Sequence, residues 1–460
     1  MKTSVVLLAA GLGTRMKSSR PKVLHPIAGK PMIWHILEAV KTIANEKPVV
    51  VIGHGAEQVS QFLEEKAQMV RQEPQLGTAH AVLQAESLVK GKTDLVLVCY
   101  ADMPLLRAET LQHLIDVQVK NKGPMSILTV ISEDPRGFGR ILRKQDNSVE
   151  AIIEETAASR EQLSIKELNV GCYCFNNSHW LWDALHRIPK NPDKDEYYLT
   201  DIVGLAAADQ LPVQAVTLED EQEAIGVNSR VHLSEVEGAM RSRINRAHML
   251  NGVTLTDPGS TYVDADVVIG EDTTIMPNTF LQGEVRIGEN CVIGPNTIIK
   301  DSVIDAECSI VASVLEGARV EVRVHIGPFA RLRKGAHLMA GVHMGNFGEV
   351  KESILGPGVK MGHFSYVGNA NIGAETNIGA GTITCNFDGE HKHETTIGEH
   401  AFIGSDTMLV APLKVGDRAR TGAGAVVTKN VPPDTLVVGM PARAIKKLIG
   451  ETGIKTESSK

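Results

Sequence analysis

The chain has 460 residues, which is too long for one hydrophobic core and predicts two or three domains. Its formal net charge of −8 argues against broad binding to nucleic acid or to an anionic membrane, so phosphate groups would have to meet local cations. Aromatic residues make up only 4% of the chain, whereas glycine reaches 42 residues, which indicates that part of the fold consists of tight turns.

The cysteines and the hydropathy pattern predict the compartment. Six cysteines are scattered along the chain without a CxxC pair, which favours reduced thiols over a disulfide framework. The sequence shows no secretory leader pattern and no apolar run near 18 residues. We therefore expect a cytoplasmic protein that does not insert into membranes.

The first half of the chain alternates short apolar runs with amphipathic stretches. This rhythm is typical of an α/β domain with a mostly parallel sheet, and we expect it over residues 1–228. The expected strands are Ser4–Ala10, Val49–Gly53, Leu95–Tyr100 and Ser126–Ile131. The expected helices are Met32–Ile43, Gly77–Leu88 and Ala108–Lys120.

A polar stretch without proline follows at residues 229–251. It predicts a long connecting helix, which the Asn251-Gly252 pair would end.

The rhythm changes again after about residue 264, where aliphatic residues recur every six positions. A strict period of six predicts a three-sided parallel β-helix, which we expect over residues 252–448. Chance matches within a β-sandwich are the alternative. The repeat breaks between Thr384 and Ile397, where a polar excursion loop is expected, and the polar tail at 449–460 is expected to be disordered. The first unbroken run comprises Ile269, Ile275, Leu281, Ile287, Ile293 and Ile299.

The stretch "LLAAGLGTRM" follows the first predicted strand and contains the pair Gly11-x-Gly13. A dinucleotide fingerprint would need a third glycine where Met16 stands and an acid about 20 residues later, and the chain has neither. Glycine turns and nearby cations instead favour a phosphate site, although a solvated basic loop is the alternative. The cations are Arg15, Lys17, Arg20 and Lys22.

A carboxylate follows the buried run "LVLVCYADMPLL", where Asp102 stands at the carboxyl end of a predicted strand. A carboxylate at that edge of a sheet can hold Mg²⁺ over substrate phosphates. The alternative is that Asp102 caps the turn before Pro104.

Together these stretches resemble the sugar nucleotidyltransferases. "LAAGLGTRM", "PKVLHPIAGKPM", "QLGTAHA", "YADMPLL", "GFGRI", "IIEE", "LNVG", "YYLTDI" and "GVNSR" occur in order. With the hexapeptide half added, the chain to about residue 430 resembles the bifunctional N-acetylglucosamine-1-phosphate uridylyltransferase / glucosamine-1-phosphate acetyltransferase family.

The resemblance implies a Rossmann-like domain joined by a long helix to a left-handed β-helix. It implies two reactions in the synthesis of a cell-envelope precursor. Acetyl-CoA would acetylate glucosamine-1-phosphate, and UTP with Mg²⁺ would then convert the product to UDP-N-acetylglucosamine and pyrophosphate. It also implies small-molecule substrates and a homotrimer.

The resemblance further implies the residues of the uridylyl site. Asp102 and Asn228 would hold Mg²⁺, although Asn228 could equally cap the connecting helix. Lys22 and Arg15 would neutralise phosphate charge during in-line attack on the α-phosphorus. The expected nucleotide contacts are Leu8, Ala9, Ala10, Gly11, Gly13, Lys22, Gln72, Gly77 and Thr78. The expected sugar contacts are Tyr100, Ala101, Asp102, Gly139, Glu154, Asn169 and Asn228.

In the acetyl site, His363 in "VKMGHFSYVGNA" matches the family's general base, and a structural turn histidine is the alternative. Lys392 of the excursion loop would reach the sugar phosphate from a neighbouring subunit. The family commonly has arginine where this chain has Met440, so we expect Arg443 or Lys446 to meet the CoA phosphates. The other sugar-phosphate contacts are Arg333, Lys351, Tyr366 and Asn377. The other acetyl-CoA contacts are Ala380, Asn386, Phe387, Ser405 and Ala423.

Two other functions fit parts of the sequence. The β-helix could only assemble or regulate a single-activity pyrophosphorylase. The chain could also be a scaffold, or a metal-binding trimer like the γ-carbonic anhydrases, for which His325, His337 and His343 are the nearest candidate ligands.

Overall fold

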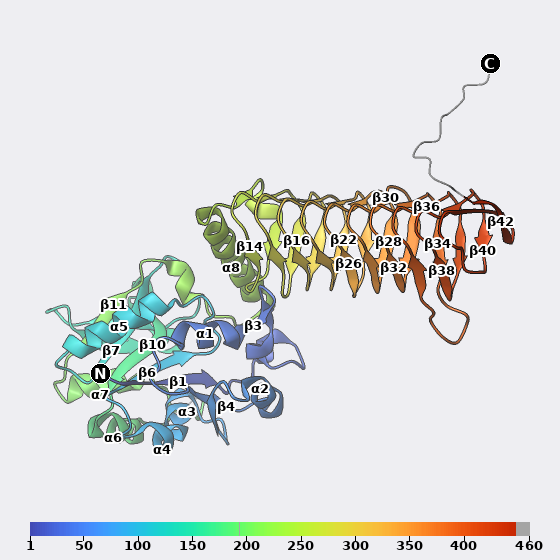
Figure 1. Ribbon diagram of the computed structural model, residues 1–460. Helices are drawn as coiled ribbons and strands as arrows, with labels where there is room; N and C mark the ends of the chain where they lie inside the picture. Colours follow the sequence, from blue (N-terminus) through green and yellow to red (C-terminus); the bar gives the residue numbers. More distant parts are fainter. Residues whose placement is uncertain (193, 448–460) are drawn as a thin grey trace. The chain divides into compact units, whose positions relative to one another are not determined.

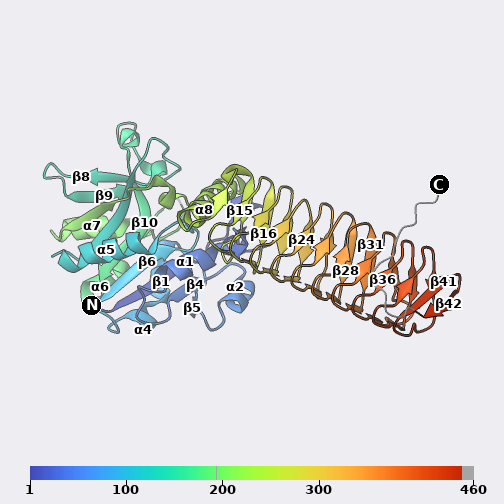
Figure 2. The same cartoon turned by 45° about the horizontal axis from the view of Figure 1, so that its top comes forward.

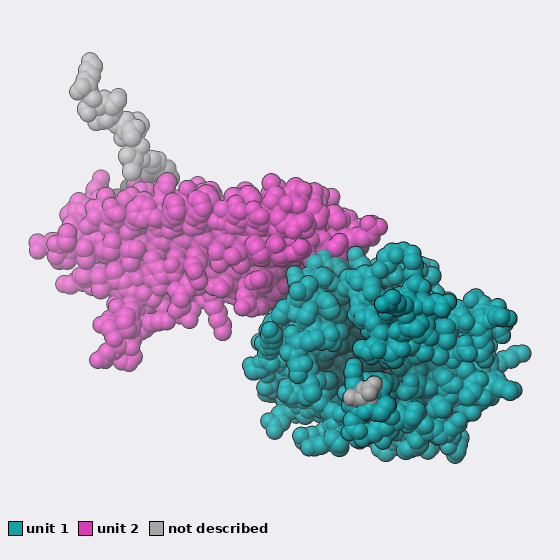
Figure 3. Space-filling model, turned by 180° about the vertical axis from the view of Figure 1, so that it is seen from behind, with its two compact units in different colours: residues 1–240 teal, residues 241–460 magenta. Residues whose placement is uncertain are grey.

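A computed structural model describes residues 1–192 and 194–447. The chain divides into two compact units, Met1–Met240 and Arg241–Lys460, which are coloured teal and magenta in Figure 3. The tail predicted to be disordered, 449–460, lies outside the described residues, as does residue 448 at the predicted end of the β-helix.

The first unit is built on one mixed sheet in the order β11-β7-β10-β6-β1-β4-β5. Neighbouring strands run parallel except β10, which is antiparallel to both β6 and β7. The hairpin β8–β9 attaches to β10. The bounds are β1 Thr3–Ala9, β4 Val49–Ile52, β5 Gln68–Arg71, β6 Leu95–Tyr100, β7 Met125–Ile131, β8 Arg140–Arg143, β9 Val149–Ile153, β10 Glu167–Asn176 and β11 Val213–Thr217. A separate hairpin pairs β2 Pro26–Ile27 with β3 Lys30–Pro31.

Helices cover both faces of this sheet because its strands are apolar on both sides. In β1, Val5 and Leu7 belong to one hydrophobic core, and Val6 and Leu8 belong to the other. In Figure 1, α1 and α5 lie on one side of the sheet, and α3, α4 and α6 lie on the other. The α-helices are α1 Met32–Val40, α2 Ala56–Leu63, α3 Thr78–Gln84, α4 Glu86–Val89, α5 Ala108–Lys120, α6 His179–Arg187, α7 Asp201–Ala208 and α8 Arg230–Leu250. The 3-10 helices are η1 Thr14–Met16, η2 Lys22–Leu24, η3 Glu155–Ala157, η4 Gln162–Ser164, η5 Glu221–Ala224 and η6 Pro258–Ser260.

Two of the predicted helices differ in extent from those observed. The helix expected over 77–88 is two helices, α3 and α4. The Ala85 N–H donates to the Val82 carbonyl (2.9 Å), three residues earlier, and this bond ends α3. The helix expected to reach Ile43 ends at Val40.

The connecting helix α8 is 21 residues long and runs across the division between the two units. Ser229 caps it, since its hydroxyl accepts the N–H of His232 (3.3 Å). The alternative role of Asn228 as this cap is therefore wrong.

The second unit is a three-sided parallel β-helix in which each side is one sheet, and its coils stack along the axis in Figure 2. Neighbouring strands within each sheet are parallel, except the terminal pair β41–β42. The first sheet comprises β12 Thr254–Leu255, β15 Thr274–Ile275, β18 Val292–Ile293, β21 Ser309–Ile310, β24 His325–Ile326, β27 His343–Met344, β30 Lys360–Met361, β33 Asn377–Ile378, β36 Phe402–Ile403, β39 Arg420–Thr421, β41 Thr435–Gly439 and β42 Ala442–Lys447. The second sheet comprises β13 Thr261–Val263, β16 Thr279–Gln282, β19 Ile298–Lys300, β22 Val314–Glu316, β25 Arg331–Leu332, β28 Gly348–Lys351, β31 Ser365–Gly368, β34 Ile383–Cys385, β37 Met408–Val410 and β40 Val426–Val427. The third sheet comprises β14 Val268–Ile269, β17 Arg286–Ile287, β20 Val303–Ile304, β23 Arg319–Val320, β26 Ala336–Leu338, β29 Ser353–Leu355, β32 Ala370–Ile372, β35 Thr395–Ile397 and β38 Leu413–Val415.

The hexapeptide period produces this architecture because one aliphatic side chain per side points into the prism. Ile269, Ile287 and Ile304 stack in register on one side and are buried. The step from Ile287 to Ile304 is 17 residues rather than 18, so one turn is a residue shorter while the inward position is kept. The parallel pairing excludes the β-sandwich alternative.

The excursion loop leaves the β-helix between β34 and β35, and it projects from the body of the prism in Figure 1. Asp388 organises it, accepting the N–H of Glu390 (2.8 Å), the N–H of His391 (2.7 Å) and a bond from the His393 ring (2.6 Å). These hydrogen bonds hold the pKa of Asp388 well below its usual range, and the bond from the His391 N–H contributes most.

Within the described part of the chain, no helix combines the length and the apolar character needed to cross a membrane.

Candidate functional site

The first site lies at the carboxyl ends of the parallel strands β1, β4, β5 and β6. Segments that leave parallel strands converge at this edge, where α/β sheets commonly bind ligands. The Ala101 N–H donates to the Leu8 carbonyl (3.0 Å), and the His54 N–H donates to the Ala10 carbonyl (3.3 Å). The segments after three different strands are thereby joined.

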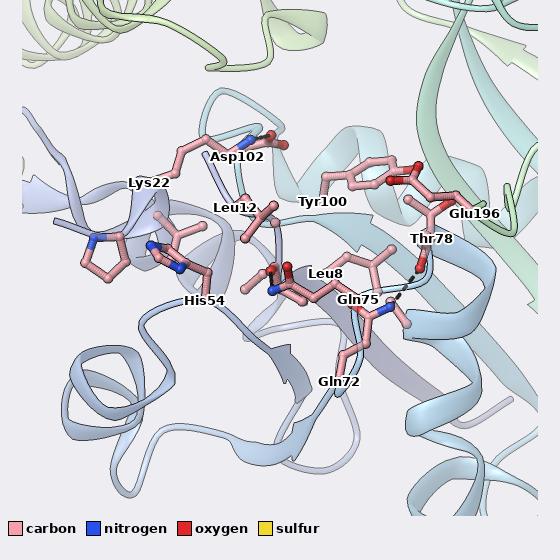
Figure 4. A pocket seen from close by; sticks show the side chains of 17 residues that line it. Leu8, Leu12, Lys22, His54, Gln72, Gln75, Thr78, Tyr100, Asp102 and Glu196 are labelled. Atoms are coloured by element: carbon pink, nitrogen blue, oxygen red, sulfur yellow. Dashed lines mark hydrogen bonds and ion pairs between the residues drawn. The ribbon is translucent and has the colours of Figure 1, made fainter. Parts of the chain in front are cut away.

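A cavity of about 380 Å³ opens at this edge. Figure 4 shows Lys22 and Asp102 toward one end and Gln72, Gln75 and Thr78 toward the other. Predicted nucleotide contacts that line it are Leu8, Ala9, Ala10, Gly11, Lys22, Gln72, Gly77 and Thr78.

A second cavity of about 200 Å³ shares two wall residues with the first, Tyr100 and Asp102. Two ligands could therefore meet there, one in each cavity. The other predicted residues that line it are Gly139, Glu154, Asn169 and Asn228.

Lys22 stands where the two cavities meet. Its ammonium contacts the Asp102 carboxylate and donates to the Asn228 side-chain oxygen at 3.3 Å. Both the Lys22 and Asp102 side chains are largely buried. Asp102 therefore faces this cation rather than capping a turn. Gly13 permits the approach, because its φ of 61° is left-handed and a Cβ there would lie 3.0 Å from the Lys22 Cβ.

The second cavity is organised by buried polar contacts. Glu154 accepts a hydrogen bond from the Thr200 hydroxyl (2.9 Å). Asn169 donates to the Tyr173 hydroxyl (2.9 Å) and accepts the Gly171 N–H (3.2 Å). These bonds hold one carboxylate and one carboxamide in place.

Two titratable groups beside this cavity are perturbed. Burial, together with the charges of Glu154 and Asp102, raises the pKa of Tyr100 well above its usual value, so its hydroxyl stays protonated. Burial and the neighbouring Glu154 raise the pKa of Asp201. Tyr100 also requires glycine at 171, where a Cβ would lie 2.3 Å from its ring.

Three predicted residues of this site line neither cavity. Arg15 is exposed on η1, with Gly13 immediately before that helix, and Ala101 is fully buried. Lys17 and Arg20 are also exposed, so of the four basic side chains in this loop only Lys22 lines either of these two cavities.

Sequence reasoning missed several lining residues. His54 follows the carboxyl end of β4, a position that the strand-end rule used for Asp102 would have found. Gln75 donates to the Ala10 carbonyl (2.5 Å), a long-range contact without a local signal. Other lining residues that were not predicted include Glu196, Met103, Phe138 and Thr200.

The second candidate site lies on the β-helix, where turns join the first sheet to the second. On neighbouring strands of the first sheet, four residues are register partners in succession: Lys360, Asn377, Phe402 and Arg420. Three positions further on in these coils stand His363, Ala380, Ser405 and Ala423. Backbone bonds join the turns, from Asp406 N–H to Ala380 (2.6 Å) and from Gly424 N–H to Ser405 (2.8 Å). We call these four residues the corner row. Because its residues stand on successive coils one strand spacing apart, the row is about 14 Å long.

His363 begins the corner row, and its side chain is exposed. It follows β30, and Tyr366 stands on the next strand, β31. Asn377 lies on the first sheet and Tyr366 on the second, so the two predicted sugar contacts flank the corner that carries His363.

Two cations stand at the carboxyl ends of second-sheet strands, and Lys392 of the excursion loop joins them. Arg333 and Lys351 occupy equivalent positions in consecutive coils, and Arg333 donates to Glu349 (3.0 Å). Lys392 lies 3.8 Å from Glu352 and close enough to Lys351 to lower the pKa of the latter. The excursion loop thus already brings Lys392 to this cluster within one chain.

The remaining predicted acetyl-CoA contacts come from the start of the excursion loop, after β34, and from the terminal hairpin. Asn386 is buried and donates to Asn369 (2.7 Å), whereas Phe387 is exposed on the loop. Arg443 pairs with Val438 on the terminal hairpin, and Val438 lies against Gly422, next to Ala423. Arg443 is therefore near the end of the corner row.

The histidines proposed as zinc ligands do not converge. The His325 and His343 rings are tilted against each other with centroids 6.4 Å apart. His337, on the third sheet, bonds instead to Glu321 (2.8 Å). Among residues 1–192 and 194–447 there is no group of three His, Cys, Asp or Glu side chains arranged to hold a metal ion.

Comparisons with known proteins match both units. Residues 5–157 match the MobA-like NTP transferase domain. Residues 266–301 match the bacterial transferase hexapeptide, as six repeats, and residues 394–429 match the hexapeptide repeat of succinyl-transferase.

Full-length relatives are similar to the whole chain. The bifunctional protein GlmU of Streptococcus uberis is 44% identical over 97% of both chains, and that of Streptococcus mutans is 45% identical over 95% of both. The bifunctional protein GlmU of Listeria monocytogenes is 43% identical over 95% of both chains.

Proposed function

Because this chain belongs to the family of bifunctional GlmU proteins, we propose that its two units catalyse two successive transfers with the residues described above. The chain is a bifunctional enzyme of UDP-N-acetylglucosamine synthesis. It acetylates glucosamine-1-phosphate with acetyl-CoA, and it transfers UMP from UTP to N-acetylglucosamine-1-phosphate. Its substrates are small molecules.

The observation that carries the uridylyl assignment is the meeting of the two cavities at Tyr100 and Asp102. UTP occupies the larger cavity, with uridine toward Gln72 and Thr78 and the phosphates toward Lys22. The sugar phosphate occupies the smaller cavity. Its phosphate oxygen then faces the α-phosphorus beside Tyr100 and Asp102, which line both cavities.

The chemistry is an in-line displacement at that phosphorus. The bond from the sugar phosphate oxygen to the α-phosphorus forms as the bond to the β-phosphate oxygen breaks, and pyrophosphate leaves. Lys22 lies where negative charge spreads in the transition state, and Glu154 and Asn169 orient the sugar.

The donor set fits Mg²⁺. The side-chain oxygens of Asp102 and Asn228 both reach one cation, the Lys22 ammonium, so they can also share one metal ion. Mg²⁺ prefers such oxygen ligands and takes the others from substrate phosphate and water. When bound, it would neutralise phosphate charge that Lys22 alone neutralises only in part.

For acetyl transfer, His363 takes a proton from the sugar's amine as the nitrogen attacks the thioester carbonyl. The C–S bond then breaks, and the CoA thiolate leaves and takes up that proton. Arg333, Lys351 and Lys392 hold the phosphate, while Tyr366 and Asn377 hold the sugar. The acyl donor follows the corner row past Ala380, Ser405 and Ala423. Its other contacts are Asn386, Phe387 and Arg443.

The assembly that we propose is a homotrimer formed through the β-helix. Its support is a ladder of exposed phenylalanines, Phe329, Phe347 and Phe364, on neighbouring turns. Phe329 and Phe347 stack with centroids 5.3 Å apart. Large apolar side chains exposed together mark interaction surfaces. Sedimentation should give three times the mass of the chain.

We place the enzyme in the cytoplasm. The six cysteines form no disulfide, which fits a reducing compartment. Both co-substrates, UTP and acetyl-CoA, are also cytoplasmic metabolites.

A coupled assay tests the proposed function. The chain is incubated with glucosamine-1-phosphate, UTP and Mg²⁺, with and without acetyl-CoA, and CoA and pyrophosphate are followed. Pyrophosphate should appear only when acetyl-CoA is present and should lag behind CoA. Release of pyrophosphate without acetyl-CoA would contradict the order, and absence of CoA release would leave only a pyrophosphorylase.

A further inference from the structure

The segment that carries Lys22 is held at both ends by one helix. The side-chain Nε of Arg230 donates to the Met16 carbonyl at 3.2 Å. The Glu237 carboxylate accepts the Ala28 N–H at 2.9 Å. Lys22 is six residues after Met16 and six before Ala28, midway between the two anchors.

The two anchors lie on one face of α8. Arg230 and Glu237 are seven residues apart, which is about two helical turns and about 10 Å along the axis. Val236 and Met240 of the same helix are buried. The helix is therefore a packed support for both contacts.

The two backbone groups held by α8, the Met16 carbonyl and the Ala28 N–H, lie in segments with buried side chains and left-handed φ values. Ala28 and Gly29 form the turn of the β2–β3 hairpin with φ values of 43° and 77°, and Ala28 is buried. A buried N–H without an acceptor is costly, so Glu237 stabilises an otherwise strained turn. At the other end, the Met16 side chain is fully buried and Lys17 has a φ of 47°.

A third observation places Arg230 against the same segment. His25 lies between Lys22 and the hairpin and is almost fully buried. Burial lowers its pKa, and the Arg230 and Arg20 guanidinium groups lower it further. The Arg230 guanidinium, whose Nε bonds to the Met16 carbonyl, thus also acts on His25 of this segment.

We propose that Arg230 and Glu237 are positioning residues for uridylyl transfer, holding the 16–28 segment so that the Lys22 ammonium meets Asp102 and Asn228. Neither side chain lines either of the two cavities described above, so we expect both to act through Lys22. Asn228 stands two residues before Arg230, so the start of α8 and the residues just before it set both sides of this contact. The inference rests on the proposed function of the first unit.

Matched variants of the full chain test it. Glu237→Met removes the acceptor at nearly constant size, and Glu237→Gln keeps one. Arg230→Met removes the donor. Glu109→Ala, on the exposed first turn of α5, is the control. Acetyl transfer in the same samples is the internal reference for intact enzyme.

Glu237→Met and Arg230→Met should each lower kcat for uridylyl transfer by about tenfold, as small misplacements of a charged group do, with KM for UTP within about twofold. Glu237→Gln should retain most of the activity, and the control should match the unchanged chain. Effects below twofold, or equal losses in acetyl transfer, would overturn the proposal.

A double-mutant cycle separates positioning from simple structural support. In a Lys22→Met background, Glu237→Met should change the residual rate by less than about twofold, because the group that it positions is gone. An undiminished tenfold effect in that background would show that Glu237 does not act through Lys22. Uridylyl transfer by the unchanged chain tests the proposed function separately.

Discussion

The Lys22 ammonium contacts the Asp102 carboxylate directly, although 80 residues separate them in the sequence. The same ammonium reaches Asn228, which lies 206 residues from Lys22. One cation thus joins the loop after β1, the carboxyl end of β6 and the residue just before the cap of α8. This junction is where the two cavities of the first unit meet.

Asp102→Ala should therefore abolish uridylyl transfer and spare acetyl transfer. The substitution removes the partner of Lys22 and the oxygen that we propose would bind Mg²⁺, so we expect a loss of at least about a hundredfold. Pyrophosphate and CoA release are measured in the same sample. Comparable losses in both reactions, or none in either, would contradict the assignment of Asp102 to the first site.

His363→Ala should lower acetyl transfer by about 10²–10⁴-fold, the usual contribution of a general base. Uridylyl transfer and the affinity for acetyl-CoA should be unchanged. His343→Ala is the matched control, since His343 is also exposed on the β-helix but lies outside the corner row. Near-normal acetylation by His363→Ala would show that another group removes the proton.

Ala423→Phe should interfere with the acyl donor, because Ala423 ends the corner row and a bulky ring would project over the path toward Arg443. We expect KM for acetyl-CoA to rise by roughly tenfold, as for loss of a few close contacts, while KM for glucosamine-1-phosphate stays nearly constant. Steady-state kinetics with each substrate varied in turn gives both values. An effect on the sugar phosphate alone would place the donor elsewhere.

Asp201→Asn should stabilise the first unit above neutral pH. Burial and Glu154 raise the pKa of Asp201 in the folded state, so its ionised form opposes folding at high pH. That cost disappears as pH falls below the carboxyl's unfolded-state pKa. The gain in melting temperature should thus be larger at pH 8 than near pH 4. All three tryptophans, Trp34, Trp180 and Trp182, lie in this unit, so their fluorescence reports its unfolding. A gain that is the same at both pH values would contradict the prediction.

The sequence by itself determined the two architectures, because each depends on a local period. Apolar runs alternating with amphipathic stretches predicted the parallel sheet, and the step from Ile269 to Ile275 to Leu281 predicted a prism with one inward side chain per face. Motifs at strand ends also predicted many cavity residues, since Gly11 and Asp102 both follow β-strands that run in the same direction.

Only the tertiary structure decided which distant side chains meet. The contacts of Thr200 with Glu154 and of Glu237 with Ala28 join segments far apart in sequence and have no periodic signal. The corner row depends on strand register, because the excursion loop makes the step from Ala380 to Ser405 longer than the others. Asn228 is the clearest case. Its side chain could have capped α8, but Ser229 accepts the helix N–H, and the Asn228 side-chain oxygen accepts a bond from Lys22 instead.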